Sequence, residues 1–376
     1  MTSSIDYTGF FATDYAESRQ RLIAGARALA PRHGVCIDSR AIDARGPADE
    51  TLALDFVIFG ARRPRNVLVV SSATHGVEGF CGSAVQHYLI EAVLPTLTLG
   101  PQTAVVLQHA NNPYGFAWQR RVNESNVDFN RNFCDTFDPD VCDPDYVLLH
   151  DDLNPTSLAP EAEAASQARI AAYIAAHGER RFQQAAIGGQ YRFPRGMQFG
   201  GARIEQGAAH LLALVAEHMG AASTVLWLDF HTGLGAFGDC ELVTGAMIDS
   251  DCYRFSNQVW QGRVKSANSG ESVSTPLNGL LDRGIERSLP SGCRLAFAYP
   301  EYGTYEPTRV MRATRNDNWL HHHGDLHDPT GRAIKAEMLE SFNPASQTWR
   351  QQVVQTGARL VDQALEHLPG ATRQSA

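Results

Sequence analysis

Apolar residues along this chain follow two patterns, short continuous runs and recurrence at helical spacing. Continuous runs bounded by polar, Pro or Gly residues predict buried strands at residues 52–59, 66–72, 103–109, 224–230 and 294–299. Recurrence every three or four residues predicts helices at residues 14–30, 83–93, 159–175, 206–218, 331–342 and 347–367. This alternation predicts an α/β fold, a three-layer sandwich with a twisted mixed sheet of about eight strands between helices.

The whole chain, residues 1–376, is expected to form a single catalytic domain, because it contains no internal repeat and no low-complexity linker. The segment at about 134–223 interrupts the alternation of strands and helices. Its middle, residues 188–201, is rich in glycine and aromatic residues. We interpret this segment as an insertion that shapes a pocket. Sites in such sheets lie beyond the carboxyl ends of the strands, which is where candidate residues are expected.

Composition narrows the class of protein. Hydrophobic residues make up 43% and charged residues 19% of the 376 residues, as in a globular enzyme. A net charge of -9 argues against broad binding to nucleic acid. The seven cysteines form no CxxC pair and fit reduced thiols in a cytoplasm. The start of the chain resembles no secretory leader, and no stretch approaches the ~18 apolar residues of a membrane span. The sequence leaves open whether the protein is a homo-oligomer.

Candidate metal ligands follow two of the predicted strands. His75 and Glu78 follow the strand at 66–72 on a tight loop before a helix, and His231 follows the strand at 224–230. Imidazole nitrogen and carboxylate oxygen suit zinc, and a catalytic zinc site needs three protein ligands. An HxxE pair alone is more typical of a polar loop before a helix than of a metal site, and a strand-terminal histidine alone is more often structural. Their occurrence together favours one Zn²⁺ ion.

Further motifs make this pattern specific. In chain order the sequence carries HGxEG, NPxG, Arg-x-Asn, VDFNRNF, DFHTG and a strand-terminal glutamate, which begin at residues 75, 112, 121, 127, 229 and 301. This ordered set, which spans about residues 52–305, resembles the zinc carboxypeptidase superfamily. Within that superfamily the chain is similar to a bacterial branch, a domain of unknown function, that carries GQYxxPxGxxxGG before the second histidine. Here that motif occupies residues 189–201.

The resemblance implies a zinc site and a base. His75, Glu78 and His231 correspond to the ligands of a single zinc ion. Glu301 corresponds to the general base that takes a proton from water and returns it to the leaving nitrogen. The expected reaction is therefore hydrolysis of an amide bond.

The resemblance also implies roles for residues that bind the substrate. Arg121 corresponds to the arginine that stabilises the oxyanion, with Arg120 as the competing assignment. Asn130 and Arg131 correspond to the pair that holds the substrate carboxylate, where a guanidinium can donate two parallel hydrogen bonds. Asp128 corresponds to the carboxylate that orients the first zinc histidine, although a buried structural aspartate is an equal alternative.

One family feature has no counterpart. The digestive members place a mobile tyrosine ahead of the glutamate, and residues 278–284 contain no tyrosine. Tyr191, Tyr302 and Tyr305 are the candidates to replace it, and the sequence leaves all three open. Substrate preference is accordingly less defined than the metal chemistry.

Two substrate classes and several alternative functions follow from these motifs. The substrate is either a small peptide cleaved by a carboxypeptidase or an N-acyl amino acid cleaved by a deacylase. Deacylases that resemble aspartoacylase carry a β-rich domain after the glutamate, whereas this chain ends in predicted helices, which favours the carboxypeptidase architecture. An alternative of another class is a non-catalytic zinc module that binds peptide carboxylates.

Two further motifs have competing interpretations. A formal GxGxxG at residues 233–238 would indicate a nucleotide-dependent oxidoreductase if a helix followed, but the next residues are strand-like. The histidines at 321–323, with Asp325 and His327, are interpreted as a solvated loop rather than as a second metal site.

Overall fold

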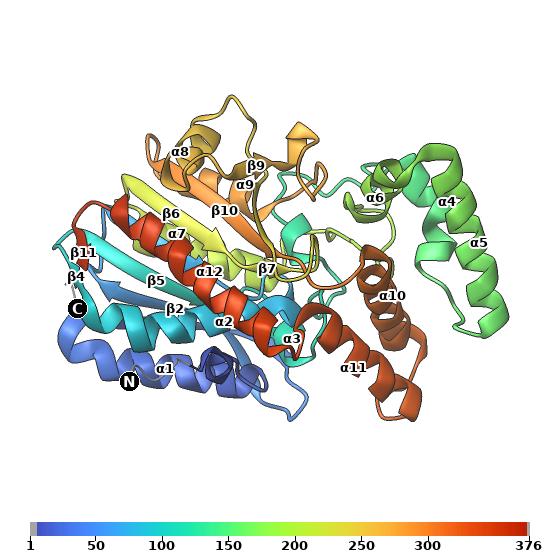
Figure 1. Cartoon of the computed structure of the whole chain (residues 1–376), viewed down its shortest axis with the longest axis horizontal. Helices are drawn as coiled ribbons and strands as arrows, with labels where there is room; N and C mark the ends of the chain where they lie inside the picture. The colour runs from blue at the N-terminus through green and yellow to red at the C-terminus, as the bar shows by residue number, and fades with distance from the viewer. Residues whose placement is uncertain (1–5, 374–376) are drawn as a thin grey trace.

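A nine-stranded mixed sheet forms the centre of the protein (Figure 1). The computed structural model describes residues 6–373. The strands of the main sheet follow the order β1-β2-β5-β3-β6-β10-β8-β9, and the short strand β7 pairs with β10. The strands are β1 (Cys36–Arg45), β2 (Thr51–Gly60), β3 (Asn66–Ser71), β5 (Thr103–His109), β6 (Thr224–Asp229), β7 (His231–Thr232), β8 (Cys240–Thr244), β9 (Val264–Ser266) and β10 (Arg294–Tyr302), while β4 (Leu97–Leu99) and β11 (Ala371–Arg373) form a separate pair.

The middle of the sheet is parallel. Strands β5, β3, β6 and β10 run in one direction, so that their carboxyl ends reach the same edge. On one side β2 is antiparallel to β5 and β1 is antiparallel to β2, and on the other side β8 is antiparallel to β10. The strand predicted at 294–299 is longer than expected and continues through Pro300. Its pairing with β6 ends at Ala298, so the missing N–H of the proline disrupts no bond to that neighbour.

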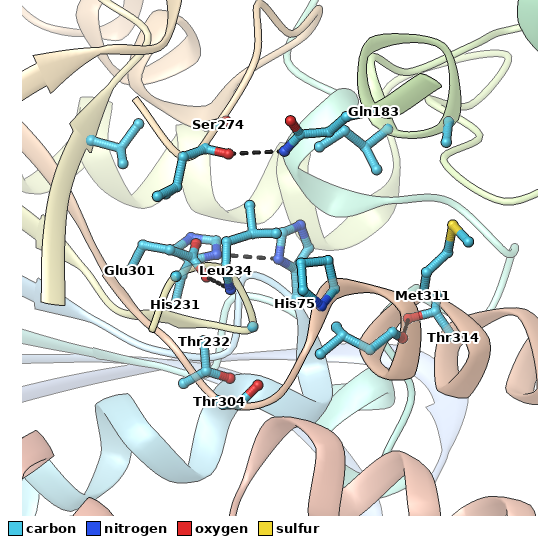
Figure 2. A pocket seen from close by; sticks show the side chains of 18 of the residues that line it. His75, Gln183, His231, Thr232, Leu234, Ser274, Glu301, Thr304, Met311 and Thr314 are labelled. Carbon is cyan, nitrogen blue, oxygen red and sulfur yellow. Dashed lines mark hydrogen bonds between the residues drawn. The ribbon is translucent and has the colours of Figure 1, made fainter. Parts of the chain in front are cut away.

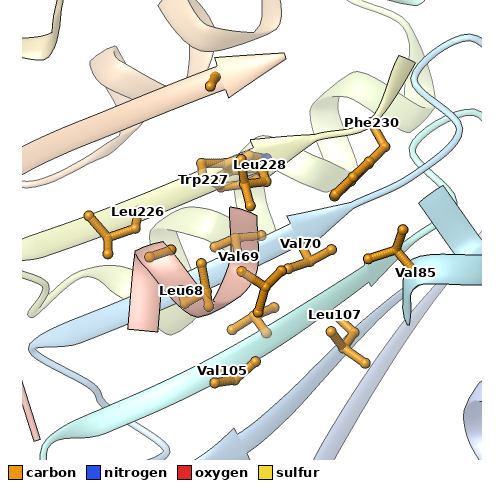
Figure 3. Close-up of a cluster of buried hydrophobic side chains, with 14 of the residues drawn as sticks. Leu68, Val69, Val70, Val85, Val105, Leu107, Leu226, Trp227, Leu228 and Phe230 are labelled. Carbon is orange, nitrogen blue, oxygen red and sulfur yellow. The ribbon is translucent and has the colours of Figure 1, made fainter. Parts of the chain in front are cut away.

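The continuous apolar runs are explained by burial of the central strands on both faces. Every residue of β5 and β6 is buried, and so is every residue of β3 after Asn66. Figure 3 shows Val69, Leu107 and Trp227 from these three strands in one cluster. Parallel strands covered on both faces carry uninterrupted hydrophobic stretches instead of alternating ones. This cluster fixes the strand ends from which the candidate ligands extend.

Helices cover both faces of the sheet, which confirms the predicted three-layer fold. Helices α1, α2 and α12 pack together on one face, and α7 packs against β1, β2 and α9 on the other (Figure 1). The helices are α1 (Tyr15–His33), α2 (Gly79–Tyr88), α3 (Pro113–Ala117), α4 (Pro144–Leu153), α5 (Pro160–His177), α6 (Glu179–Ile187), α7 (Gln206–Met219), α8 (Asp251–Val259), α9 (Leu281–Ser288), α10 (Pro307–His323), α11 (Pro329–Phe342) and α12 (Gln347–Glu366).

The segment interpreted as an insertion contains a small core of its own. Tyr146, Leu149, Tyr173 and Phe182 from α4, α5 and α6 form a buried cluster separate from the main core. In Figure 1 these helices lie to one side of the sheet, beyond α10. The segment therefore reaches outward from the sheet edge at which the parallel strands end.

Two local predictions were wrong and one was confirmed. Helix α1 does not end near Pro31 but continues to His33, where Gly34 in a left-handed conformation terminates it. The histidines at 321–323 form the last turn of α10 instead of a loop. The glycine-rich residues 233–238 lead into strand β8, as predicted.

The structure bears on two further expectations. None of the helices in residues 6–373 is long and apolar enough to cross a membrane. All seven cysteines are free thiols. The prediction about the start of the chain concerns in part residues 1–5, which lie outside the described residues.

Candidate metal centre

The loop after β3 is shaped by close packing that only glycine permits. A Cβ atom on Gly76 would lie 1.9 Å from the carbonyl carbon of Gly115, and Ala73 turns the chain with a φ of 60°. The loop is fastened to the neighbouring segment by hydrogen bonds from Gly76 N to Arg121 O (3.2 Å) and from Val77 N to Arg120 O (2.8 Å). The sequence HGxEG therefore places its histidine and glutamate directly beside the two arginines.

The three predicted ligands converge in the structure. His75 Nδ1 lies 3.0 Å from Glu78 Oε1, and His231 Nδ1 lies 3.1 Å from Glu78 Oε2. The two Nδ1 atoms are 3.1 Å apart, and all three residues are buried. Figure 2 shows the two imidazoles side by side, with the contact between their nitrogens drawn as a dashed line. One small site therefore receives a donor atom from each residue.

Each imidazole is oriented by an aspartate on its far side. His75 Nε2 lies 3.1 Å from Asp128 Oδ1, as predicted, and His231 Nε2 lies 2.8 Å from Asp229 Oδ2. A proton held on Nε2 leaves Nδ1 as the free lone pair. The role of Asp229 was missed in the sequence. The signal was the carboxylate two residues before the strand-terminal histidine in DFHTG.

Strand pairing places Glu301 opposite His231. In the parallel ladder of β10 and β7, Glu301 pairs with His231, and its Oε1 accepts a hydrogen bond from Leu234 N (3.0 Å). Figure 2 shows the carboxylate of Glu301 beside Leu234, and both residues line a cavity. The predicted base thus lies next to the predicted ligands.

The two adjacent arginines lie in different surroundings. Arg121 lines the cavity and donates to Glu78 Oε1 (3.0 Å) and Asp128 Oδ2 (3.2 Å), and its Nη2 lies 2.9 Å from His75 Nε2. Arg120 is buried elsewhere and pairs with Asp317. When His75 Nε2 carries a proton, it donates that proton to Asp128 and cannot also accept a hydrogen bond from Arg121. Of the two competing residues, only Arg121 is placed to act in the site.

Asn130 and Arg131 also line the cavity. Asn130 Oδ1 accepts a hydrogen bond from Leu281 N (2.8 Å). Arg131 is 2% exposed and donates to two backbone carbonyls, Asn130 O (2.9 Å) and Ile187 O (2.8 Å), while its buried Nε has no partner among the described residues. Both side chains are therefore held in fixed positions at the cavity wall, and Arg131 retains N–H groups for a ligand.

Of the three tyrosines proposed to fill the vacant role, Tyr305 alone lines the cavity. The hydroxyl groups of Tyr191 and Tyr302 donate to the backbone carbonyls of Arg131 (2.7 Å) and Val353 (3.1 Å). The structure adds Tyr299, which lines the cavity with its ring centroid 5.2 Å from that of His231. Its signal in the sequence was its position two residues before Glu301, on the same face of a strand.

The cavity above the site has a volume of about 1050 Å³. Much of its wall is apolar, and the residues of the insertion contribute a large share of it. These residues are Ile174, Glu179, Arg180, Phe182, Gln183, Ala186, Ile187, Met197 and Gln198. Gln183 Nε2 donates to Val273 O (2.9 Å), which connects α6 to the loop before α9. A cavity of this size accommodates a small organic molecule.

The electrostatics of the site favour a cation. Burial by itself raises the pKa of Glu78, but His75 and His231 lower it below its usual value. Burial by itself lowers the pKa of His231, but Asp229 and then Glu78 raise it to about 10. Burial and the charge of Glu78 raise the pKa of Glu301 above its usual value. A buried histidine keeps its proton only where negative charge surrounds it, so the site has an excess of negative charge.

The donor atoms fit zinc. Tetrahedral zinc at about 2.0–2.1 Å from each nitrogen separates its ligand atoms by about 3.3 Å, and the two Nδ1 atoms here are 3.1 Å apart. Two histidines with one carboxylate are a usual ligand set for catalytic zinc, with a fourth position left for water. The residues around the site therefore match the ion that the motifs predict.

A family model agrees with the motif-based prediction. The model described as "Protein of unknown function (DUF2817)" matches residues 11–356, which is most of the chain and includes every residue of the candidate site. No curated protein matches this chain in sequence.

Solved structures similar to this chain include a fibrinolysis inhibitor, a carboxypeptidase A and a succinylglutamate desuccinylase. Bovine thrombin-activatable fibrinolysis inhibitor is 11% identical, with 92% of this chain and 98% of that chain covered and a TM-score of 0.43. Carboxypeptidase A from Helicoverpa armigera is 12% identical, with 88% and 74% covered and a TM-score of 0.42. A succinylglutamate desuccinylase from Silicibacter sp. TM1040 is 12% identical, with 77% and 67% covered and a TM-score of 0.40.

Proposed function

The chain belongs to the DUF2817 family, and from the geometry of its site we propose that it is a zinc-dependent hydrolase that cleaves an amide bond. The proposed substrate is a small peptide or an N-acyl amino acid with a free carboxylate. The observation that carries the proposal is the convergence of His75 Nδ1, His231 Nδ1 and the Glu78 carboxylate, with Glu301 on the adjacent strand end.

In this proposal the side chains of the site divide into two layers. His75, Glu78 and His231 hold the zinc, and Asp128 and Asp229 fix the two imidazoles with Nδ1 toward the ion. A zinc ion bound by these residues would supply Lewis acidity toward the amide carbonyl and would make water a stronger acid. The aspartates keep the ligands ordered before the substrate arrives.

Glu301 serves as the base and then as the acid. One carboxylate oxygen accepts the N–H of Leu234 at 3.0 Å, which holds the side chain in place. The other oxygen takes a proton from water and returns it to the leaving nitrogen. The raised pKa of Glu301 suits this exchange, because a carboxyl group that gains and loses a proton near neutral pH can act in both steps.

Arg121, Asn130 and Arg131 are proposed to hold the charges of the substrate. Arg121 stabilises the negative oxygen that develops on the amide carbon, since it faces the cavity beside Glu78. Asn130 and Arg131 bind the carboxylate of the substrate. Leu280 and Ile187 line the cavity next to them, so the residue that carries the carboxylate is expected to have an apolar side chain.

The whole chain is proposed to act as one catalytic domain, with residues 134–223 as the insertion that shapes the pocket. The cavity-lining side chains of α5 and α6 support this assignment. A carboxypeptidase is favoured over a deacylase because the chain after Glu301 is mainly helical, as α10, α11 and α12 show.

The test begins with metal content and a substrate screen. Purified protein is expected to bind about one equivalent of zinc by elemental analysis. Mass spectrometry of the zinc-loaded protein with short peptides and N-acyl amino acids is expected to reveal products from one of the two classes. Removal of the zinc by a chelator is expected to abolish turnover, and its return to restore it. Activity that persists in metal-free protein would contradict the proposal.

The first variant tests the base. Glu301→Gln is expected to retain one zinc ion and lose turnover by at least about 10³-fold, because the general base is removed while the ligands remain. Glu306→Gln is the matched control, since Glu306 also lines the cavity but is exposed. Zinc and ligand binding without any hydrolysis by the wild type would instead indicate a non-catalytic module.

A further inference from the structure

The loop of residues 189–201 lies against the proposed carboxylate site without contributing a metal ligand. Phe199 O accepts a hydrogen bond from Asp128 N (2.7 Å), and Gly200 O accepts one from Asn132 Nδ2 (2.8 Å). The loop therefore follows residues 128–132 closely, and its side chains can reach the same wall of the cavity.

The glycines of this loop allow that close approach. A Cβ atom on Gly189 would lie 2.8 Å from Arg131 Cδ, and one on Gly200 would lie 2.8 Å from Arg131 O. A Cβ atom on Gly201 would lie 2.6 Å from Asn132 Nδ2. The glycines of the GQYxxPxGxxxGG motif thus fit the loop onto Arg131 and Asn132.

The two glutamines of the loop differ in how their amides are bonded. Gln190 Oε1 accepts hydrogen bonds from Arg192 N (2.9 Å) and Phe193 N (2.7 Å), and its Nε2 donates to Phe193 O (2.9 Å) and Met197 O (3.3 Å). The amide of Gln190 is therefore fully occupied in holding the shape of the loop.

The amide of Gln198 has a different environment. Gln198 lines the cavity and is 6% exposed, and its buried Oε1 has no hydrogen-bond partner among residues 6–373. Its backbone has a φ of 59°, a left-handed conformation that glutamine rarely adopts. A buried polar atom without a partner and a strained backbone both destabilise the fold, and strained residues cluster at functional sites.

We propose that Gln198 is a substrate-binding residue that donates a hydrogen bond from its carboxamide to the substrate carboxylate. This inference rests on the proposed function of the site. The carboxamide can turn by half a rotation, so that its nitrogen takes the place of its oxygen. The buried Nε of Arg131 also lacks a partner in the described part of the chain and belongs to a side chain of the same wall. With the carboxamide turned in this way, the wall presents two donors, Gln198 Nε2 and Arg131 Nε, which match a ligand that only accepts hydrogen bonds, such as a carboxylate.

Binding of a matched pair of ligands tests this proposal without turnover. The probes are N-acetyl-L-phenylalanine and its carboxamide, which share an apolar side chain and differ in the charged group. Titration calorimetry of the zinc-loaded wild type is expected to show at least about tenfold tighter binding of the acid, because hydrogen bonds to charged groups are the stronger ones. Gln198→Glu is expected to remove this preference, since two carboxylates repel each other, and to change binding of the carboxamide little.

Gln198→Gly separates a binding role from a structural one. Glycine relieves the left-handed backbone and removes the buried amide, so the Tm is expected to stay unchanged or to rise. Preference for the acid over the carboxamide is expected to fall by about tenfold. Gln190→Met is the matched control in the same loop, and it is expected to lower the Tm because four hydrogen bonds are lost.

The outcomes separate this inference from the proposed function. A Gln198→Glu variant that keeps the wild-type preference for the acid would overturn the role of Gln198. A wild type with no preference, including one that binds neither probe, would overturn it as well. Failure of the wild type to hydrolyse any amide would overturn the proposed function alone, because the two binding ratios are measured at equilibrium.

Discussion

Arg120 and Arg121 are neighbours in the chain, yet they belong to two opposite kinds of charged cluster. Arg120 is 4% exposed and pairs with Asp317, which also accepts a hydrogen bond from Lys335 (2.6 Å). Arg121 faces the cavity and contacts Glu78, Asp128 and His75. In the Arg120 cluster one carboxylate, that of Asp317, is shared by two cations, so this cluster has no excess of negative charge. The cluster around Arg121 carries excess negative charge and needs a cation.

One short segment of the chain thus contributes to stability through Arg120 and to the candidate site through Arg121. The Arg120 cluster connects the loop before η5 (Phe129–Arg131) to α10 and α11, and burial of its charges is compensated by pairing. The Arg121 cluster keeps its donors at a cavity wall, where charge can change during a reaction. Variants in the first should alter the free energy of unfolding, and variants in the second should alter metal binding or turnover.

The largest expected effect is loss of stability on removal of the charge of Asp317. Asp317→Asn leaves the buried Arg120 and the partly buried Lys335 without a carboxylate, which should lower the free energy of unfolding by about 3–5 kcal/mol. Chemical denaturation of the zinc-loaded protein measures this. Glu337→Gln is the control, since its pair with Arg309 is partly exposed and is worth about 0–1 kcal/mol. Equal effects of the two substitutions would remove the distinction between a closed cluster and an ordinary surface pair.

The next effect in size is on catalysis, through Arg121. Arg121→Met should lower kcat by about 10²–10³-fold, because the developing negative oxygen loses a donor. Its effect on the free energy of unfolding of the zinc-loaded protein should be smaller than that of Asp317→Asn. Arg121→Lys tests whether charge alone suffices, and partial recovery of kcat is expected. If Arg121→Met lowered the free energy of unfolding by several kcal/mol and left kcat intact, Arg121 would be a structural residue and its assignment to turnover would be wrong.

Much of the fold could be predicted because the central strands are buried on both faces. The observed bounds of β3, β5 and β6 lie within one residue of the predicted ones, since nothing polar interrupts their apolar runs. Strand β1 was missed because it lies at the edge of the sheet, and half of its sequence CIDSRAIDAR is polar. Helices α4 and α6 were also missed, because they bury only a few residues against a small local core.

The candidate site was predictable where a residue type and a strand end coincide. His75, Glu78, His231 and Glu301 all follow or end strands that carry a clear apolar pattern, and the structure brings them together. The choice between Arg120 and Arg121 could not be made from sequence, because it depends on which side of one short segment faces the cavity. Tyr299, Asp229 and Gln198 were missed for the same reason, since their roles depend on which atoms they face.

An intermediate effect is expected on metal affinity. Asp229→Asn and Asp128→Asn should each weaken zinc binding by about 10–100-fold, because the imidazoles lose the carboxylates that orient them. Competition with a chromogenic chelator measures this. Asp282→Asn is the matched control, because Asp282 is a buried carboxylate whose pKa is raised by burial and which contacts Gly245 N and not a histidine. If all three variants lost zinc equally, the loss would reflect general damage rather than the orientation of the ligands.

The smallest expected effect is the pH dependence of the Arg120 cluster, in which His321 Nε2 lies 3.6 Å from Asp317 Oδ1. Burial lowers the pKa of His321 to about 3, against about 6.5 in an unfolded chain, so the unfolded state binds the extra proton first. The stability associated with neutral His321 is therefore complete well above pH 6.5 and is lost as the pH falls from 6.5 toward 3. Between pH 8 and pH 5.5 the wild type should lose about 1 kcal/mol that His321→Gln does not lose. Denaturation of both proteins at the two pH values measures the difference. An equal loss in both would place the acid sensitivity outside the Arg120 cluster.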